Sequence, residues 1–379
     1  MPTAEPQAGG PDSSVTEELY REWRSPRFGR ANPERLNNPV WEWLIKSESS
    51  AYAARTRFEP PNEQCADPAW SFARFGQSST QLADGRTILI AGEHEDSYDP
   101  DFYIYNDVVV RHLDAGIDIY GYPRDVFPPT DFHTATLAGG RIILIGCLGY
   151  PADRNPEVTP VELLDLDTFA MSRVETSGTQ PGWIHRHEAT LSDDGSAILI
   201  RGGKIVRGTV GAQDLLENPD DWRLDLASWR WDRLTARRWT QWRISRADGR
   251  PNRLWQVQSL WTLRGGRWAK EHRESMEMMI RGQMEDLTKE YGSVPDLETF
   301  GILYQPSVGH EPIPDVEAQY GVRRIAVDDT IIRYIEQPSA VQMIVEGDLP
   351  DARVAQLAAD LRDKLARIEN TEYVVRQLS

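Results

Sequence analysis

The chain has 379 residues, which leaves room for two or three domains of about 150 residues each. Its 40% hydrophobic and 27% charged residues are typical of a folded globular protein rather than a disordered one. The 59 acidic residues outnumber the 42 basic ones, so the net charge is −17, and no block of Lys or Arg offsets it. Because nucleic-acid phosphates would repel such a chain, we expect no nucleic-acid partner.

The sequence contains no apolar stretch of about 18 residues, so it predicts no transmembrane helix and no membrane partner. The first residues lack the basic start and apolar core of a secretory signal, which makes the cytoplasm the expected location. Cys65 and Cys147 are too few for a disulfide framework, and no Cys/His spacing matches a zinc site. These patterns predict no cofactor.

The N-terminal part combines a tail with helical patterns. Residues 1–13 are rich in Pro, Gly and Ala and are expected to form a disordered tail. A helical cap is expected over residues 14–69, because a capping-box pattern begins at Ser14. Asn38, followed by Pro, predicts the start of a second helix that can continue to Phe58.

From residue 70 onward the sequence shows an internal repeat. Three similar segments occupy residues 78–93, 133–147 and 187–203, with turn glycines at positions 85, 140 and 195, which are 55 residues apart. Each segment predicts a β-hairpin. A second pair of strands is expected after each one, at residues 107–120, 161–174 and 221–234. Four strands per period of about 55 residues is typical of a propeller blade.

The third repeat resembles the kelch family. Its matching residues are His187 before the first strand, Gly202 and Gly203 after the second, and Trp222 and Trp229 on the following pair. The resemblance implies that residues 70–265 form the blades of a β-propeller. That propeller would be partial or atypical, because three clear units are fewer than the four to eight or so of a closed ring. A degenerate fourth blade is expected over residues 239–268.

Residues 266–379 are expected to form a C-terminal α+β domain. The patterns predict a helix at 268–291, a hairpin at 322–337, a strand at 340–347, a helix from Pro350 and a strand at 373–378. A strand, helix and strand in this order predict a parallel, right-handed crossover. The expected fold is therefore mainly β with α+β: a kelch-like propeller with N-terminal helices and this C-terminal domain.

The candidate site is one end of the predicted blades. In a four-stranded antiparallel blade, the loop after the second strand and the segment entering the next blade lie at the same end. The polar and aromatic residues in these connections form the predicted binding site: Glu93, His94, Glu95, Asp96, Tyr98, Asp99, Asp101, Tyr122, Arg124, Asp125, Phe127, Trp183 and His185. Their aromatic side chains are expected to be exposed.

The expected function is recognition of a protein partner through this end of the propeller. The net charge of −17 favours a basic partner, and an inhibitor or immunity-type protein is one concrete version. Since the blades are few, a homodimer that completes one ring is an alternative.

An enzyme is the other alternative for the same loops. The kelch resemblance then implies an isomerase, lyase or oxidase with a His/carboxylate site at His94, His185 and Asp96. The acidic loop could also hold a divalent metal through His94, Glu95 and Asp96. His133 and His187 occupy equivalent repeat positions, so we expect them to be buried, hydrogen-bonded blade residues.

Overall fold

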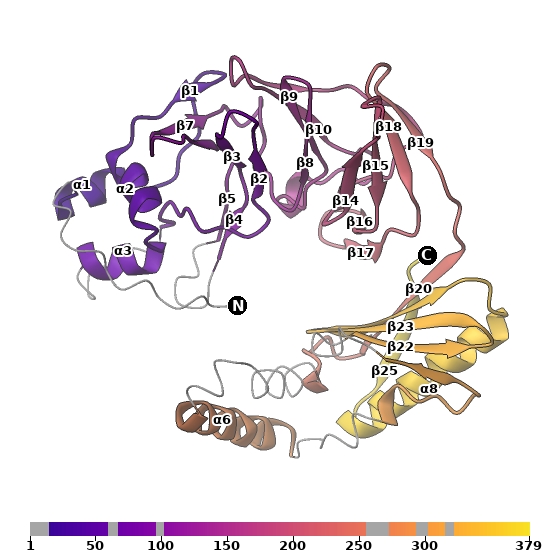
Figure 1. Ribbon diagram of the computed structural model, residues 1–379. Helices are drawn as coiled ribbons and strands as arrows, with labels where there is room; N and C mark the ends of the chain where they lie inside the picture. The colour runs from indigo at the N-terminus through magenta and orange to yellow at the C-terminus, as the bar shows by residue number, and fades with distance from the viewer. Residues whose placement is uncertain (1–14, 60–66, 96–101, 255–272, 293–301, 315–321) are drawn as a thin grey trace. The chain divides into compact units, whose positions relative to one another are not determined.

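The structure is a computed structural model that describes residues 15–59, 67–95, 102–254, 273–292, 302–314 and 322–379. Its internal contacts divide the chain into two units, Met1–Ala236 and Arg237–Ser379, called unit 1 and unit 2 below. Most of the regular structure is antiparallel β-sheet (Figure 1), as expected for a mainly β protein. Of the helices in the described ranges, none combines the length and apolar character that a bilayer crossing requires.

Three short helices precede the sheets of unit 1: α1 (Glu17–Trp23), α2 (Pro39–Ser47) and α3 (Ala51–Phe58). Asn38 caps α2 as predicted, because its side chain accepts hydrogen bonds from the N–H groups of the first turn. The first helix begins later than expected, with Thr16 as its cap. Glu48 takes a left-handed conformation (φ 53°) and divides the expected long helix into α2 and α3.

Three four-stranded antiparallel sheets follow. Sheet 1 contains β2 (Ser78–Gln81), β3 (Thr87–Ile90), β6 (Val108–Arg111) and β7 (Ile117–Gly121). Sheet 2 contains β8 (Thr134–Ala138), β9 (Arg141–Ile145), β10 (Val161–Asp165) and β11 (Met171–Arg173). Sheet 3 contains β14 (Glu188–Leu191), β15 (Ala197–Arg201), β18 (Trp222–Asp225) and β19 (Arg230–Arg233). The hairpins predicted from the repeat, and the strand pair after each, are therefore confirmed.

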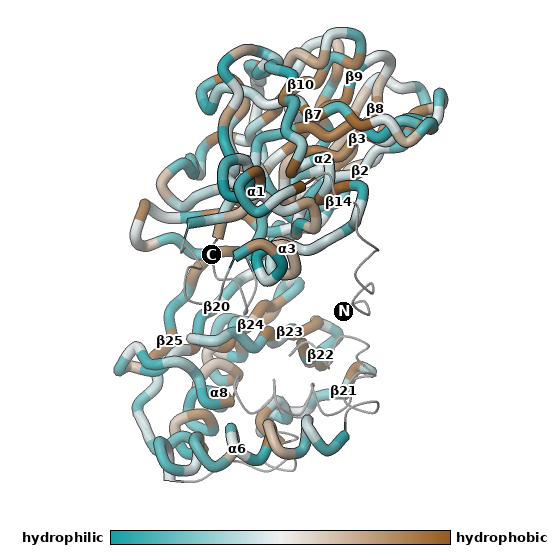
Figure 2. Tube along the Cα trace, turned by 90° about the vertical axis from the view of Figure 1, so that its left-hand side faces the viewer, coloured by the Kyte–Doolittle hydropathy of each residue, from teal (hydrophilic) through white to brown (hydrophobic). Residues whose placement is uncertain are grey.

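The three sheets pack face to face in chain order (Figure 1), and β8 contacts both β2 and β14. Successive side chains of a strand point to opposite faces, so a strand with apolar residues on both faces can join two cores. In β9, Ile142 and Leu144 belong to the core shared with sheet 1, whereas Ile143 and Ile145 belong to the core shared with sheet 3. Figure 2 shows the hydrophobic stretches of β3 and β9 in brown. Sheet 2 is therefore buried on both faces.

The first sheet of this stack is covered by helices. Ile88 and Ile90 of β3 pack against sheet 2, while Leu89 between them packs against the N-terminal helical cluster. That cluster includes Trp41 of α2 and Trp70, whose rings stack at 4.9 Å. The helices thus bury the face of sheet 1 that points away from sheet 2.

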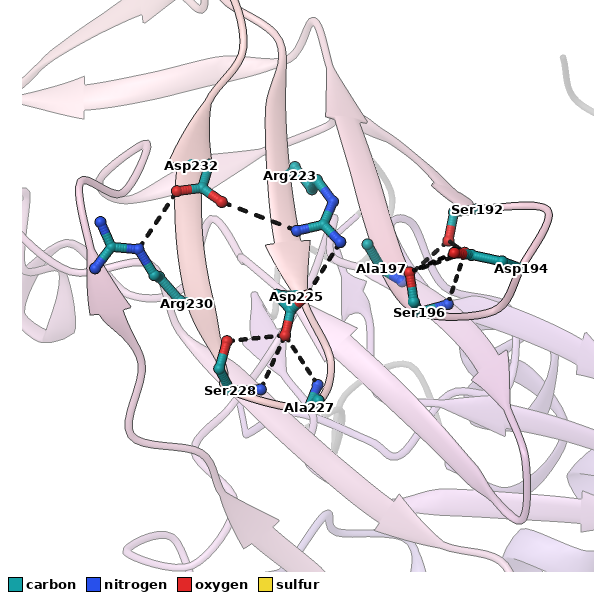
Figure 3. Close-up of polar contacts among 10 residues, drawn as sticks. All are labelled: Ser192, Asp194, Ser196, Ala197, Arg223, Asp225, Ala227, Ser228, Arg230 and Asp232. Carbon is teal, nitrogen blue, oxygen red and sulfur yellow. Dashed lines mark hydrogen bonds and ion pairs between the residues drawn. The ribbon is translucent and has the colours of Figure 1, made fainter.

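The last sheet ends the stack with a charged face. Leu224 and Trp231 point toward sheet 2, whereas Arg223, next to Leu224 in β18, lies on the opposite face. There Arg223 forms ion pairs with Asp225 at 3.0 Å and with Asp232 at 3.9 Å, as Figure 3 shows. A further apolar sheet cannot pack on this ionic surface without burying its charges, and within the described part of unit 1 no further sheet follows sheet 3.

Short strands supplement these sheets. They are β1 (Glu34–Arg35) beside β7, β12 (Ser177–Gly178) beside β19, the pair β4 (Glu93–His94) and β5 (Tyr103–Ile104), and the trio β13 (Ile184–His185), β16 (Lys204–Arg207) and β17 (Asp214–Glu217). A 3-10 turn, η1, covers Pro151–Asp153. β4, β5 and β13 lie in the connections that the sequence identified as the candidate site.

Unit 2 is a six-stranded sheet with helices. Its strands, in spatial order, are β21 (Glu311–Ile313), β22 (Val322–Val327), β23 (Thr330–Gln337), β24 (Ala340–Glu346), β20 (Trp239–Arg246) and β25 (Tyr373–Gln377). The helices are α6 (Arg273–Tyr291) and α8 (Asp351–Glu369). Leu357, Leu361 and Leu365 of α8 share one core with Val341 and Met343 of β24, so α8 covers one face of the sheet.

β20 corrects two expectations about the boundary region. It pairs with β24 and β25, so Trp239–Arg246 belongs to the sheet of unit 2 and not to a fourth propeller blade. The remaining positions 255–268 of the expected fourth blade lie outside the described residues. β24 and β25 are parallel as predicted, but β20 lies between them and is antiparallel to both.

Candidate functional site

The end of the three sheets at which their second strands finish is called the loop face. It comprises residues 73–76, 91–95, 102–107, 122–133, 146–160 and 175–187. Backbone hydrogen bonds tie these connections together: Gly92 N–H donates to Thr130 (2.8 Å), Leu148 N–H to Asp131 (3.0 Å), Cys147 N–H to Ile184 (3.0 Å) and Arg186 N–H to Phe132 (2.9 Å). The loop face is therefore one hydrogen-bonded surface built from distant parts of the sequence.

The β4–β5 hairpin lies in the connection between β3 and β6 of sheet 1. Glu93 pairs with Ile104 on one side and with Phe75 on the other. Buried His94, the next residue, has its Nδ1 3.3 Å from the Ala73 carbonyl. The backbone pairing fixes Glu93 and His94 against two other segments.

Exposed aromatic rings surround this hairpin. Phe75 is 61% exposed and Phe102 is 40% exposed. The ring of Phe102 packs edge-on against that of Tyr150 at 5.8 Å. The Tyr150 hydroxyl accepts a hydrogen bond from the Ile104 N–H at 3.0 Å, which joins the connection between β9 and β10 of sheet 2 to β5.

Charged residues lie beside these rings. Arg124 is exposed and forms an ion pair with Asp153 at 2.7 Å. Its guanidinium also lies 5.9 Å from the centre of the Tyr150 ring, within the range of a cation–π contact. Asp125 and Glu95 are exposed as well. Arg124, Asp125 and Glu95 are thus on the surface, as the sequence suggested.

Three aromatic residues expected at the surface are buried instead. Tyr122 and Phe127 are core residues whose rings meet edge to face at 5.7 Å. The Asn106 side-chain amide donates to both of their carbonyl groups, which folds this segment inward. Trp183 is buried too, and its indole N–H donates to the Leu148 carbonyl at 3.0 Å. The expectation of exposed rings at these three positions is wrong, because each ring fills a gap between connections.

His185 is also deeply buried, in β13 opposite Lys204. Its side chain is 1% exposed, and neither ring nitrogen has a hydrogen-bond partner among the described residues. Burial, together with nearby Arg186 and Lys204, lowers the pKa of His185 to about 3. Its imidazole is therefore neutral at pH 7 and offers a lone pair as an acceptor.

Two carboxyl groups of the loop face, those of Glu93 and Asp131, have raised pKa values. Burial raises the pKa of Glu93 to about 7, and the nearby Asp131 carboxylate contributes to this rise. Burial also raises the pKa of Asp131, while the Gly149 N–H, which donates to its Oδ1 at 2.6 Å, opposes the rise. Arg186 interacts electrostatically with both carboxyl groups. These groups form an ionisable cluster at the loop face.

His133 and His187 bridge the sheets, in agreement with their equivalent repeat positions. His133 Nε2 lies 2.8 Å from the Ser78 hydroxyl, and His187 Nε2 lies 2.9 Å from the Thr134 hydroxyl. Both side chains are buried. Their burial and hydrogen bonding are as predicted. In addition, each histidine links the start of one sheet to the first strand of the preceding sheet.

Part of the predicted acidic site cannot be placed. Asp96, Tyr98, Asp99 and Asp101 lie outside the described residues. Within the described ranges, no group of three or more His, Cys, Asp and Glu side chains has the arrangement to hold a metal ion. The metal set of His94, Glu95 and Asp96 and the catalytic set of His94, His185 and Asp96 stay predictions, because both include Asp96.

Cys147 follows β9 and is buried and free. Burial raises the pKa of its thiol well above the usual value, and the carboxylates of Asp131 and Glu162 add to the rise. A thiol in this state is a poor nucleophile. Cys147 therefore packs as a small apolar residue beside Trp183 and Val206.

Sequence reasoning did not identify several residues of the loop face: Phe75, Phe102, Asp131, Tyr150 and Arg186. The repeat held a signal for two of them. Asp131 lies two residues before His133, and Arg186 lies directly before His187. The exposure of Phe75 depends on the bridge to Glu93, which the local sequence does not encode.

Comparison with known proteins does not identify this chain. No protein-family model matches it, and no curated protein matches it. Among solved structures, it is similar to part of the polysaccharide lyase Uly1, with 16% sequence identity and a TM-score of 0.25. That match covers 38% of this chain and 27% of the lyase chain, and such a low score carries no argument about fold or activity.

Proposed function

We propose that unit 1 is a protein-recognition module that binds a basic protein partner through the loop face. The observation that carries this proposal is the set of exposed rings, Phe75 and Phe102, around the β4–β5 hairpin. Tyr150 and Arg124 extend the same surface. Aromatic and arginine side chains held on a rigid backbone are the anchors that protein interfaces use most often.

The proposal treats unit 1 as a partial, kelch-like propeller. Three four-stranded sheets stack in order, and their hairpins repeat every 55 residues in the sequence. The helices at one end and the ionic face of sheet 3 at the other support a complete array of three blades rather than an unfinished ring. A partner bound by such an array could be a basic enzyme or toxin, which would make this chain an inhibitor or immunity-type protein.

The test is capture of partners by the purified full chain and by variants. Phe75→Ala combined with Phe102→Ala should reduce recovery of the captured basic protein at least about tenfold, because each ring is expected to be an anchor. Leu113→Ala is the matched control, since Leu113 is exposed in the β6–β7 turn, outside the loop face. Equal recovery with all three proteins would overturn the proposal.

The charge of the partner has its own test. Since the chain carries −17, attraction to a basic partner should weaken when salt shortens the range of electrostatic forces. Capture should fall when NaCl is raised from about 0.1 M to about 0.5 M, because the range of electrostatic attraction then shrinks to a few ångströms. An acidic partner, or capture that salt does not change, would contradict the basic-partner part of the proposal.

An enzyme is the second candidate, favoured by one observation. Glu93, with its pKa near 7, lies in the same network as the buried neutral imidazole of His185, and such groups suit acid–base catalysis. Metal analysis of the purified protein tests the metal-dependent form. A stoichiometric ion that is lost in His185→Ala would favour the enzyme, whereas the recognition module predicts no such loss.

A further inference from the structure

Asp131 and His185 occupy equivalent positions in successive repeats. Each lies two residues before the histidine that bridges to the preceding sheet, His133 or His187. The Arg186 N–H donates to the Phe132 carbonyl at 2.9 Å, which joins the two segments one residue further along. The backbone therefore brings Asp131 and His185 together at the start of sheets 2 and 3.

Both side chains are buried and have acceptor atoms without a donor. Asp131 is 0% exposed, and its Oδ1 accepts from the Gly149 N–H at 2.6 Å, but Oδ2 has no partner among the described residues. The two ring nitrogens of His185 have no partner in that part of the chain either, and in the neutral imidazole one of them is an acceptor while the other carries a hydrogen. A buried acceptor without a donor costs free energy, so these atoms favour a ligand that supplies N–H groups.

The carboxyl groups of Asp131 and Glu93 favour a cationic ligand, whereas the charges that act on His185 are those of Arg186, Lys204 and Arg154. Glu93, half-buried in β4, adds a second carboxyl group to the Asp131 site. Arg154 interacts with Asp131, but its guanidinium donates to the carbonyls of Leu148 and Gly149 and to the side chain of Gln213.

Arg186 is the exposed residue of this cluster. Its guanidinium lies 3.5 Å from the centre of the Phe132 ring, and its charge acts on both Glu93 and Asp131. Because Arg186 packs on a ring and forms no ion pair with either carboxylate among the described residues, another cation could take over its electrostatic role. Such a cation would reach Asp131 and His185 from the surface on which Arg186 and Glu93 lie.

We infer that Glu93, Asp131 and His185 form an acceptor cluster for a lysine or arginine side chain of the protein partner, which displaces Arg186. This inference rests on the proposed function and names the chemistry that the loop face recognises. Phe75 and Phe102 would supply apolar anchors, and the cluster would select for the positive charge. Protein interfaces gain specificity from such buried charged contacts more than they gain affinity.

The probes are methylguanidinium for an arginine, methylammonium for a lysine, and methylurea as the uncharged counterpart of methylguanidinium. We expect one of the cations to bind the full chain in a calorimetric or NMR titration, and methylurea not to bind. Asp131→Asn should weaken that binding at least about tenfold, and Arg186→Ala should strengthen it by removing the competing cation. Which cation binds more tightly identifies the partner side chain.

Proton release provides a readout that folding defects do not imitate. A cation beside Glu93 stabilises its carboxylate, so binding at pH 7 should release part of a proton, measured from the enthalpies in two buffers. Glu93→Gln should bind the cation more weakly, and without this release. Binding of neither cation, or binding that is unchanged in Asp131→Asn, would overturn the inference.

Failure of this inference can be told apart from failure of the proposed function. If Phe75→Ala with Phe102→Ala abolishes partner capture while neither cation binds, the loop face recognises a partner without this cluster. If a cation binds through Asp131 while the phenylalanine variants still capture the partner, the acceptor cluster stands and the aromatic anchors are wrong. Thermal unfolding of each variant identifies any that do not fold.

Discussion

Gly146 lies where sheet 2 approaches the segment that leads into sheet 3. It follows β9 with φ +68°, and a Cβ atom there would lie 2.2 Å from the Ile184 carbonyl oxygen and 2.9 Å from the His187 ring. The backbone cannot yield at this place without separating the two sheets. Glycine is thus required by a close approach as well as by its conformation.

Gly146→Ala should therefore destabilise unit 1 by more than the cost of placing an alanine in the left-handed conformation. Gly139→Ala is the matched control, since Gly139 has φ +62° but nothing within 4 Å of an added Cβ. We expect the control to cost about 1–2 kcal/mol and Gly146→Ala to cost about 2 kcal/mol more. Urea unfolding measures both, and equal losses would contradict the close packing of sheets 2 and 3.

The bridging histidines predict a dependence on acid. Burial lowers the pKa of His187 to about 3 and that of His133 to about 4, both below the value of about 6.5 in an unfolded chain. Below about pH 6.5 the histidines of the unfolded state take up protons and those of the folded state do not. The free energy of unfolding therefore decreases as the pH is lowered. The loss is about 1.4 kcal/mol per pH unit for each histidine, until the folded-state pKa is reached.

His187→Gln separates this contribution from opposing ones. Glu162 has a pKa raised by burial to about 7, so its protonation in the folded state favours folding as the pH falls. The glutamine variant keeps a side chain that can bond to Thr134 but does not titrate. Between pH 6.5 and pH 5 it should lose about 2 kcal/mol less stability than the original chain. Parallel pH profiles in urea unfolding would contradict a buried, neutral His187.

At the residue scale, sequence reasoning placed polar residues better than aromatic ones. His133 and His187 were expected to be buried and bonded because their positions repeat, and the structure agrees. Tyr122 and Phe127 looked like surface residues because they lie in a Pro-rich connection between strands. Their burial depends on the Asn106 amide, a contact that a local pattern cannot show.

At the scale of elements, the strand sequences contain more information about stacking than the repeat alone suggested. Continuous apolar runs such as Ile142–Ile145 in β9 indicate strands buried on both faces. In β18, the alternation of Trp222, Arg223, Leu224 and Asp225 indicates one apolar and one polar face. That alternation argues against a fourth blade packed on sheet 3, which was expected over residues 239–268.

The ionic face of sheet 3 predicts the effect of removing its charges. Arg223→Leu combined with Asp232→Leu extends the apolar row that begins with Leu199 in the paired strand β15. We expect this variant to self-associate as its concentration rises, while its unfolding free energy changes by no more than about 1 kcal/mol, because exposed ion pairs contribute little. Sedimentation measures the association.

A control places the same two apolar residues elsewhere. Glu17→Leu with Arg21→Leu removes an exposed ion pair from α1, which is not part of a sheet face. This variant should sediment as the original chain does. If both leucine variants associate equally, the effect is general surface hydrophobicity, and sheet 3 does not end the stack by its charge.

At the scale of the whole molecule, the two units differ in how far the sequence predicted them. The hairpins of unit 1 and the order of elements in β22 to β25 follow from local periodicity and turn residues. The position of β20 does not follow from local patterns. β20 pairs with β24, and most of the sequence of unit 2 lies between these two strands. Local patterns show that a segment is a strand, but they do not show which sheet it joins.

The loop face gathers segments from all three sheets, so partner recognition is a property of the whole of unit 1. Contact between Phe75, Phe102 and a partner should protect the whole hydrogen-bonded surface around them, whereas the turns at the opposite end should stay unaffected. The opposite end includes Leu113 and Gly139, which lie in turns between strands of sheets 1 and 2. The two ends provide an internal comparison within one molecule.

The most direct measurement is hydrogen–deuterium exchange of the full chain with and without its captured partner. Recognition through the loop face predicts slower exchange at residues 73–76, 92–95, 102–105 and 122–125 on binding, and no change at residues 112–116 and 139–140. Protection confined to the opposite turns, to the ionic face of sheet 3 or to unit 2 would contradict recognition through the loop face.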